Sequence, residues 1–170
     1  MGCKLGDIKL ILITHGDSDH TGNAAYLRKK HTAKISMHKN DLEMVEKGDM
    51  SYNRKVNFIT LIVFSLTFSK LSKSDRFIPD IYVEDGQDLS DHGFDAEVIH
   101  IPGHLKGSIG ILTEDGNLFC GDLLENTKKL VINSIMGDMV AVNGSFEKLR
   151  KLNINTVYPC HGKTFRMDYL

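Results

Sequence analysis

The sequence predicts a domain of the α/β class, in which one strand–helix–strand unit is followed by a run of short strands. Residues 7–14 (DIKLILIT) are almost continuously apolar and β-branched, which is typical of a strand buried on both faces. Asn23 to Lys30 predicts a helix, with Ala24, Ala25 and Leu27 apolar and residues 28–30 polar, and Ala33 to His38 has the composition of a second strand. Because a strand, a helix and a strand in this order usually form a parallel crossover, we expect the two strands to pair in parallel.

The elements after this unit are shorter. We expect Asn40 or Asp41 to cap a short helix that runs to Lys47 and stops at Gly48. The region 49–80 has a mostly helical pattern around its apolar part. The sequence after residue 80 is rich in strand patterns, with turn dipeptides at 85–86 and 115–116. We expect strands at 97–101, 108–113, 117–120 and 156–159. We also expect a helix that Ser145 caps and that runs to Leu152.

The length and composition indicate one globular domain over residues 1–170, large enough to bury a core. The net charge of -1 argues against nucleic acid as a default partner, since phosphate binding usually requires a basic excess. The most apolar run, Val56 to Phe68, contains four polar residues and is shorter than the roughly 20 residues that a membrane span needs. We therefore expect no membrane insertion and interpret this run as a buried helix or an interface element.

Three cysteines, at positions 3, 120 and 160, are too few and too scattered for a disulfide framework. No apolar segment typical of a secretion signal follows Lys4. A reducing cytoplasm is the simplest location for such a chain. We interpret Cys120 and Cys160 as small buried packing residues, with sensitivity of a neighbouring site to oxidation as the alternative.

The segment from Thr14 to His20 (THGDSDH) brings together four side chains that bind metals, namely those of His15, Asp17, Asp19 and His20. It follows directly on the first predicted strand, so a rigid element would hold the loop. Each of these residues alone would be explained as a satisfied polar residue or a helix cap. Two carboxylates packed with two imidazoles are electrostatically unfavourable without a cation, and the mixture suits zinc, iron or manganese.

Three later segments each place one ligand-type residue after a predicted strand. His104 follows Ile101-Pro102-Gly103, Asp122 follows Phe119-Cys120-Gly121, and His161 follows the strand at 156–159. A turn explains each segment on its own. Since side chains at the carboxyl ends of several strands converge on one crevice, the three together with the first segment predict a single metal site.

The order THGDSDHTG, PGH, GD and PCHG resembles the metallo-β-lactamase superfamily from Ile11 to Gly162. The resemblance implies a four-layer αββα sandwich with two divalent metal ions, zinc first and iron or manganese as alternatives. It also implies how the ligands divide between the ions. One ion would be held by His15, Asp17 and His104, the other by Asp19, His20 and His161, with Asp122 bridging them.

Two features depart from the usual pattern of this family. Asp17 stands where the commonest motif has a second histidine, which should weaken the Lewis acidity of that ion and favour harder metals. Only 13 residues precede the first motif, which begins at Thr14, whereas family members have several strands there. We therefore expect one sheet to lack strands and to expose an edge. A second copy of the chain would cover this edge as a homodimer; an altered fold and a fragment of a longer protein are the alternatives.

The resemblance implies a binuclear hydrolase acting on a small molecule. A hydroxide shared by the two ions would attack an ester, thioester, lactone or phosphodiester, with Asp19 both binding a metal and orienting the nucleophile. Two other functions remain open. One is a di-iron redox protein of the flavodiiron type, which the carboxylate at Asp17 favours although the chain has no flavin module; the other is a metal-binding remnant without activity.

Overall fold

The computed structural model describes residues 3–52, 70–132 and 137–169, and the predicted element Val56 to Phe68 lies outside these ranges. The chain forms two compact units, Met1–Val83 and Glu84–Leu170, which are described one at a time. Within the described residues, no helix is both long enough and apolar enough to cross a bilayer. The prediction of a single domain stays a prediction.

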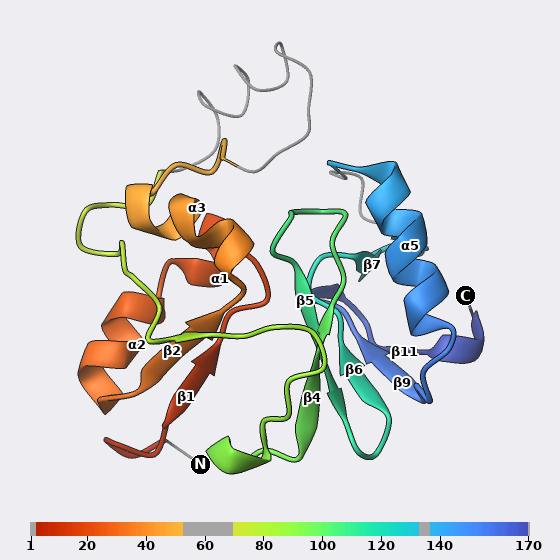
Figure 1. Cartoon of the computed structure of the whole chain (residues 1–170), viewed down its shortest axis with the longest axis horizontal. Helices are drawn as coiled ribbons and strands as arrows, with labels where there is room; N and C mark the ends of the chain where they lie inside the picture. Colours follow the sequence, from red (N-terminus) through yellow and green to blue (C-terminus); the bar gives the residue numbers. More distant parts are fainter. Residues whose placement is uncertain (1–2, 53–69, 133–136, 170) are drawn as a thin grey trace. The chain divides into compact units, whose positions relative to one another are not determined.

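The first unit contains a three-stranded parallel sheet in the order β1-β2-β3. Its strands are β1 (Leu10–Leu12), β2 (Lys34–Met37) and β3 (Ile81–Tyr82). The helix α2 (Ala24–His31) connects β1 to β2 and packs beside β2 (Figure 1). The predicted parallel strand–helix–strand unit is therefore confirmed, with Leu10 paired to Lys34.

The expectation that the first strand is buried on both faces was wrong. All three residues of β1 are only partly buried, and the strand spans Leu10–Leu12 rather than the whole of residues 7–14. The reason is its position, because among the described strands β1 pairs only with β2 and forms an edge of the sheet. Full burial begins one residue later, at Ile13.

Two short helices follow strands of this unit. α1 (Ser18–Thr21) comes shortly after β1, and α3 (Leu42–Lys47) comes after β2 and a single 3-10 turn, η1 (Lys39–Asp41). The prediction for α3 is confirmed, since Asp41 occupies the N-cap and the helix ends at Gly48. That glycine has φ +69°, a left-handed conformation that a residue without a side chain adopts at little cost.

The second unit is built on a five-stranded sheet in the order β11-β9-β6-β5-β4. The predicted strands correspond to β4 (Ala96–His100), β5 (Ile109–Thr113), β6 (Asn117–Phe119) and β9 (Thr156–Tyr158), and β11 (Phe165–Arg166) completes the sheet. A second sheet, which was not predicted, has the order β10-β7-β8 and contains β7 (Leu124–Asn126), β8 (Leu130–Ile132) and β10 (His161–Gly162). Two 3-10 turns, η2 (Ser90–His92) and η3 (Met167–Tyr169), flank the five-stranded sheet in sequence.

The helix α5 (Met139–Leu149) packs along one face of the five-stranded sheet (Figure 1). Val142 and Leu149 of the helix share a buried core with Leu118 of β6 and Val157 of β9. The prediction that this helix starts at Ser145 was wrong. Asp138 caps it instead, since its carboxylate accepts hydrogen bonds from the backbone N–H groups three and two residues later, at 3.3 and 3.0 Å.

Candidate metal-ligand clusters

The first donor set (His15, Asp17, Asp19 and His20) lies in the first unit, in the loop after β1 and in α1. The His15 ring is 1% exposed, and its Nδ1 atom lies 3.1 Å from the Thr14 hydroxyl. Its other ring nitrogen, Nε2, lies 3.7 Å from a carboxylate oxygen of Asp17. The Thr14 contact orients the ring, as partners of ligand histidines commonly do, and directs Nε2 toward the carboxylate.

One turn of helix brings the other members of the first donor set together. Asp17 is the N-cap residue of α1, and its carboxylate makes no capping hydrogen bond. Asp19 and His20 follow in the first turn, where the His20 Nε2 atom lies 3.4 Å from an Asp19 carboxylate oxygen. The rings of His15 and His20 lie with their centroids 4.0 Å apart. Two imidazoles and two carboxylates therefore gather within one short segment.

The second donor set (His104, Asp122 and His161) lies in the second unit. An Asp122 carboxylate oxygen lies 3.4 Å from the His161 Nε2 atom, and a ligand atom of His104 also lies within 4.8 Å of the Asp122 carboxylate. His104 and Asp122 are buried, whereas 44% of the His161 side chain is exposed. The structure thus brings together three residues that are separated by up to 57 positions (161 - 104) in the sequence.

The loop before His104 is fixed by the helix α5. The Pro102 carbonyl accepts a 2.7 Å hydrogen bond from the Ser145 hydroxyl, and the Gly103 carbonyl accepts the N–H groups of Gly137 and Asp138 at 2.9 and 3.0 Å. Gly103 has φ +148°, and an added Cβ would lie 2.5 Å from a methyl carbon of Val142. Only glycine allows the backbone to approach the helix this closely.

His161 is held differently from the other members of the two donor sets, because it belongs to a strand. It begins β10, which pairs in parallel with β7 so that His161 lies opposite Glu125. Gly162, the next residue, has φ +104°, and a Cβ there would lie 2.2 Å from the backbone of Asn126. The sequence placed His161 after β9, which is confirmed, but it gave no sign of the second sheet.

The two cysteines near the second donor set differ in environment. Cys120 is buried as predicted, and burial raises the pKa of its thiol to about 12. The prediction that Cys160 is buried was wrong, because this thiol is exposed. Its sulfur lies within 4.8 Å of the Asp122 carboxylate, so Cys160 joins the surroundings of the second donor set rather than the core.

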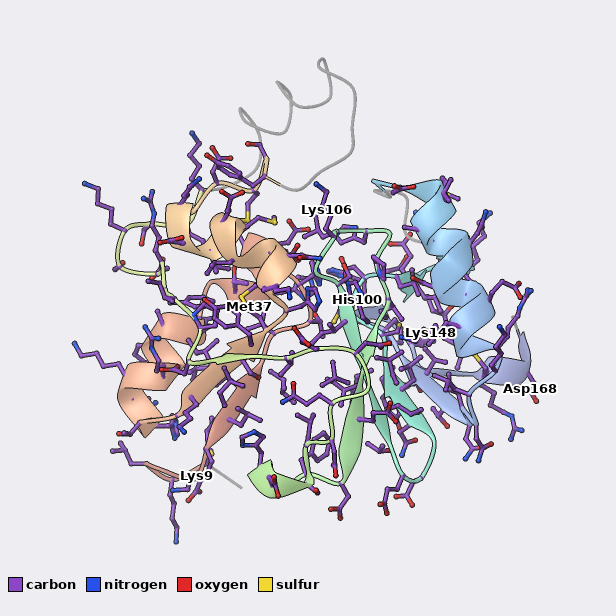
Figure 2. The ribbon with its side chains drawn as sticks, in the orientation of Figure 1. Lys9, Met37, His100, Lys106, Lys148 and Asp168 are labelled. Atoms are coloured by element: carbon purple, nitrogen blue, oxygen red, sulfur yellow. The ribbon has the colours of Figure 1, made fainter. Side chains whose placement is uncertain are left out.

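Two histidines outside the donor sets, His38 and His100, make hydrogen bonds to the backbone. The His38 Nδ1 atom accepts the N–H of Asn40 at 3.2 Å in the turn after β2. The His100 Nε2 atom lies 2.9 Å from the Lys106 carbonyl oxygen, and the His100 carbonyl accepts a hydrogen bond from Lys148 of α5 (Figure 2). Both rings therefore contact the backbone of the loops beside them.

The chemistry of each donor set fits a transition metal. Imidazole nitrogen and carboxylate oxygen are the usual ligands of zinc, and the same atoms bind iron and manganese. In both sets, buried or partly buried imidazoles lie within 4 Å of carboxylate oxygens. A cation stabilises such a group of acceptors, whereas packing alone gives no reason to gather them.

Comparison with known proteins shows the family. The profile of the metallo-beta-lactamase superfamily matches residues 1–161. The chain belongs to this superfamily. A probable metallo-hydrolase of Methanocaldococcus jannaschii is 30% identical over 161 residues, which cover 92% of this chain and 71% of that protein. The predicted resemblance is therefore confirmed.

Two hydroxyacylglutathione hydrolases are also similar. The Haemophilus influenzae protein GloC is 32% identical over 69% of this chain and 50% of its own length, and the Shewanella loihica protein is 33% identical over 91% and 48%. The chain thus spans about half the length of these two relatives.

Solved structures confirm the predicted metallo-β-lactamase fold. The crystal structure of TTHA1623 in a di-iron-bound form has a TM-score of 0.69 with 25% identity. The match covers 94% of this chain and 72% of that one. The BLEG-1 B3 metallo-beta-lactamase has a TM-score of 0.74 with 20% identity over the same shares. The α/β fold of the metallo-β-lactamase type that the sequence predicts is therefore confirmed.

Proposed function

We propose that this chain is a metal-dependent hydrolase whose two donor sets together hold two divalent metal ions. The observation that carries the proposal is the convergence of imidazoles and carboxylates within each unit, at every position that the sequence motifs select. We assign His15, Asp17 and His104 to one ion, Asp19, His20 and His161 to the other, and Asp122 to both. Membership of the superfamily supports joining the two sets in one site.

The reaction proposed is hydrolysis of an ester bond, and a thioester is the first candidate. Two relatives are named hydroxyacylglutathione hydrolases, which favours a thioester over a lactone or a phosphodiester. Bound divalent ions supply Lewis acidity and lower the pKa of water toward neutrality. Zinc is the first expectation for the metal, and iron is supported by Asp17 and by the di-iron form of a structural neighbour.

The exposure of the side chains in the first donor set suggests which of them bind metal and which acts on the attacking water. Asp19 has 60% of its side chain exposed and lies 3.4 Å from His20, so its carboxylate is open to a water molecule while the ring restrains it. We assign Asp19 the role of accepting a proton from the attacking water and orienting it. His15 and Asp17 are more buried and serve to hold metal rather than to exchange protons. The homodimer and the cytoplasmic location remain predictions.

Metal analysis and turnover test the proposal together. The full chain is reconstituted separately with zinc, iron and manganese, and the bound metal is measured beside hydrolysis of thioesters, esters, lactones and phosphodiesters. Asp122→Ala should lower both metal content and turnover, and the exposed Asp91→Ala serves as the control. Well under one bound ion per chain in every preparation would refute the proposal. Full metal content without any turnover would instead support the inactive remnant.

The di-iron redox protein is the second candidate, and Asp17 is the observation that favours it. A carboxylate beside His15 makes the first donor set harder and more suited to iron. Oxygen consumption by the iron-loaded chain with an added reductant distinguishes this activity from hydrolysis. Reductant-dependent oxygen consumption without thioester hydrolysis would favour the redox function.

A further inference from the structure

Asp41 is a fully buried carboxylate in the first unit, 0% exposed, and the sequence explains it only as a helix cap. It does occupy the N-cap of α3, but its side chain makes no capping hydrogen bond there. One carboxylate oxygen instead accepts the backbone N–H of Gly16 at 3.1 Å, across 25 residues of sequence. The side chain thus binds the loop at residues 14–17, which carries His15 and Asp17 and is called the ligand loop below, instead of capping its own helix.

The turn after β2 gives Asp41 this position. The N–H of Asp41 donates to the His38 carbonyl at 3.3 Å, which folds the chain back at the end of the strand. Because β1 and β2 are parallel and adjacent, the loops at their carboxyl ends lie side by side. The turn therefore faces the loop that carries the first donor set.

The same face of α3 also contacts Gly16 through packing. Met44, one turn after Asp41 and fully buried, lies so close that a Cβ on Gly16 would be 2.8 Å from its sulfur and 3.1 Å from its Cβ. The Cβ of Asp41 itself would be 3.2 Å away. A hydrogen bond and a close contact thus fix the backbone of the one residue that lies between His15 and Asp17.

We propose that Asp41 is a positioning residue, which fixes the backbone of the ligand loop at Gly16 and thereby directs the side chains on either side of it. An ionised carboxylate forms a stronger bond to an N–H group than a neutral acceptor does, and a buried carboxylate requires such partners. The step from backbone position to metal affinity rests on the proposed function. The hydrogen bond joins two groups of the chain itself and can be tested on the metal-free protein.

The first experiment uses the metal-free full chain and measures exchange of the Gly16 amide hydrogen by NMR. Asp41→Ala should accelerate this exchange by at least about tenfold, because the hydrogen bond that protects the amide is lost. Asp41→Asn retains a carbonyl oxygen and should restore most of the protection. If Asp41→Ala does not fold, Asp41→Glu keeps the charge but displaces the oxygen, and it should also lose protection at Gly16.

Asp80→Ala is the matched control. Its carboxylate also accepts a backbone N–H, that of Ile35 at 2.8 Å. Asp80 belongs to the same unit, but it lies directly before β3, whereas Asp41 lies in the turn directly after β2. This variant should leave exchange at Gly16 unchanged. Equal acceleration at Gly16 in Asp41→Ala and Asp80→Ala would show general loosening and overturn the proposal. Unchanged exchange in the folded Asp41 variants would overturn it as well.

The second experiment titrates zinc into the same proteins in competition with a chromophoric chelator. Asp41→Ala should weaken zinc binding by about 10- to 100-fold, with partial rescue in Asp41→Asn and no change in Asp80→Ala. Zinc binding by Asp41→Ala with the affinity of the wild type overturns the positioning role. If the wild type binds no metal, the proposed function fails, and the Gly16 exchange experiment still decides the role of Asp41.

Discussion

Replacing Ser145 by alanine removes the hydrogen bond that connects α5 to the loop before His104. The serine is buried, and its hydroxyl donates to the Pro102 carbonyl at 2.7 Å. The variant removes this donor inside a packed region, where leaving a polar group without its partner costs about 1–3 kcal/mol. The missing oxygen adds only a small void, so the lost hydrogen bond should dominate the change in unfolding free energy.

Urea unfolding followed by circular dichroism measures this change. We expect Ser145→Ala to lower the unfolding free energy by about 1–3 kcal/mol with an unchanged dependence on urea. Ser90→Ala is the control, because that hydroxyl also makes a short hydrogen bond, 2.8 Å to Asp88, but on the exposed surface. Its effect should stay within about 0.5 kcal/mol. Equal losses in the two variants would refute the argument that the buried bond holds the loop.

Three further changes have definite expected outcomes. Gly162→Ala should abolish pairing of β10 with β7 and weaken metal binding, since its Cβ would lie 2.2 Å from backbone atoms, and metal titration beside thermal unfolding checks this. Hydrogen bonds from Ser51 lower the pKa of Asp49, so the ionised carboxylate stabilises the fold fully at pH values above its ordinary pKa of 3.8. This stabilisation is lost as the pH falls through the lowered pKa. Ser51→Ala should reduce that loss, as the unfolding free energy measured against pH would show. The Cys120 thiol, with its pKa raised to about 12, should resist iodoacetamide at pH 8 in the native chain while the other two cysteines react, as mass spectrometry would show.

The strand–helix–strand unit could be predicted because its signals are local. Each of its three elements is indicated by a pattern within about ten residues. These patterns are the apolar run that contains β1, the helical pattern of α2 and the composition of β2. The partial burial of β1 could not be predicted in the same way. An apolar run has the same composition in the centre of a sheet and at its edge, and only the pairing partners distinguish the two.

The start of α5 illustrates a different limit. Ser145 with Glu147 in the following turn has the composition of a helix start, and Gly144 before it is a typical helix breaker. The structure uses this serine inside the helix, where its hydroxyl bonds to a carbonyl 43 residues earlier. A tertiary hydrogen bond here outweighs the local preference of serine for a helix start, and the sequence of the helix does not reveal the partner of that bond.

The candidate ligands could be chosen from the sequence because only a few residue types bind transition metals and several of these residues follow strand ends. Within each unit the chosen residues lie close together, with the His15 and His20 ring centroids 4.0 Å apart and an Asp122 carboxylate oxygen 3.4 Å from the His161 Nε2 atom, and their role as ligands stays a prediction. The exposure of Cys160 was not predictable, since cysteine is common in cores and the residue follows a buried strand. The exposure of the Cys160 side chain depends on the turn that leads into β10, and the sequence does not indicate this turn.

The groups that hold the ligand loops follow one physical rule in both units. Asp41 binds the backbone of Gly16 from the start of α3, and Ser145 binds the backbone of Pro102 from within α5. In each case a glycine, Gly16 or Gly103, lets the helix approach the loop more closely than a side chain would allow. A metal ligand must be held to within a fraction of an ångström, whereas folding tolerates larger shifts. Changes at these holding contacts should therefore weaken metal binding more than their effect on unfolding alone accounts for.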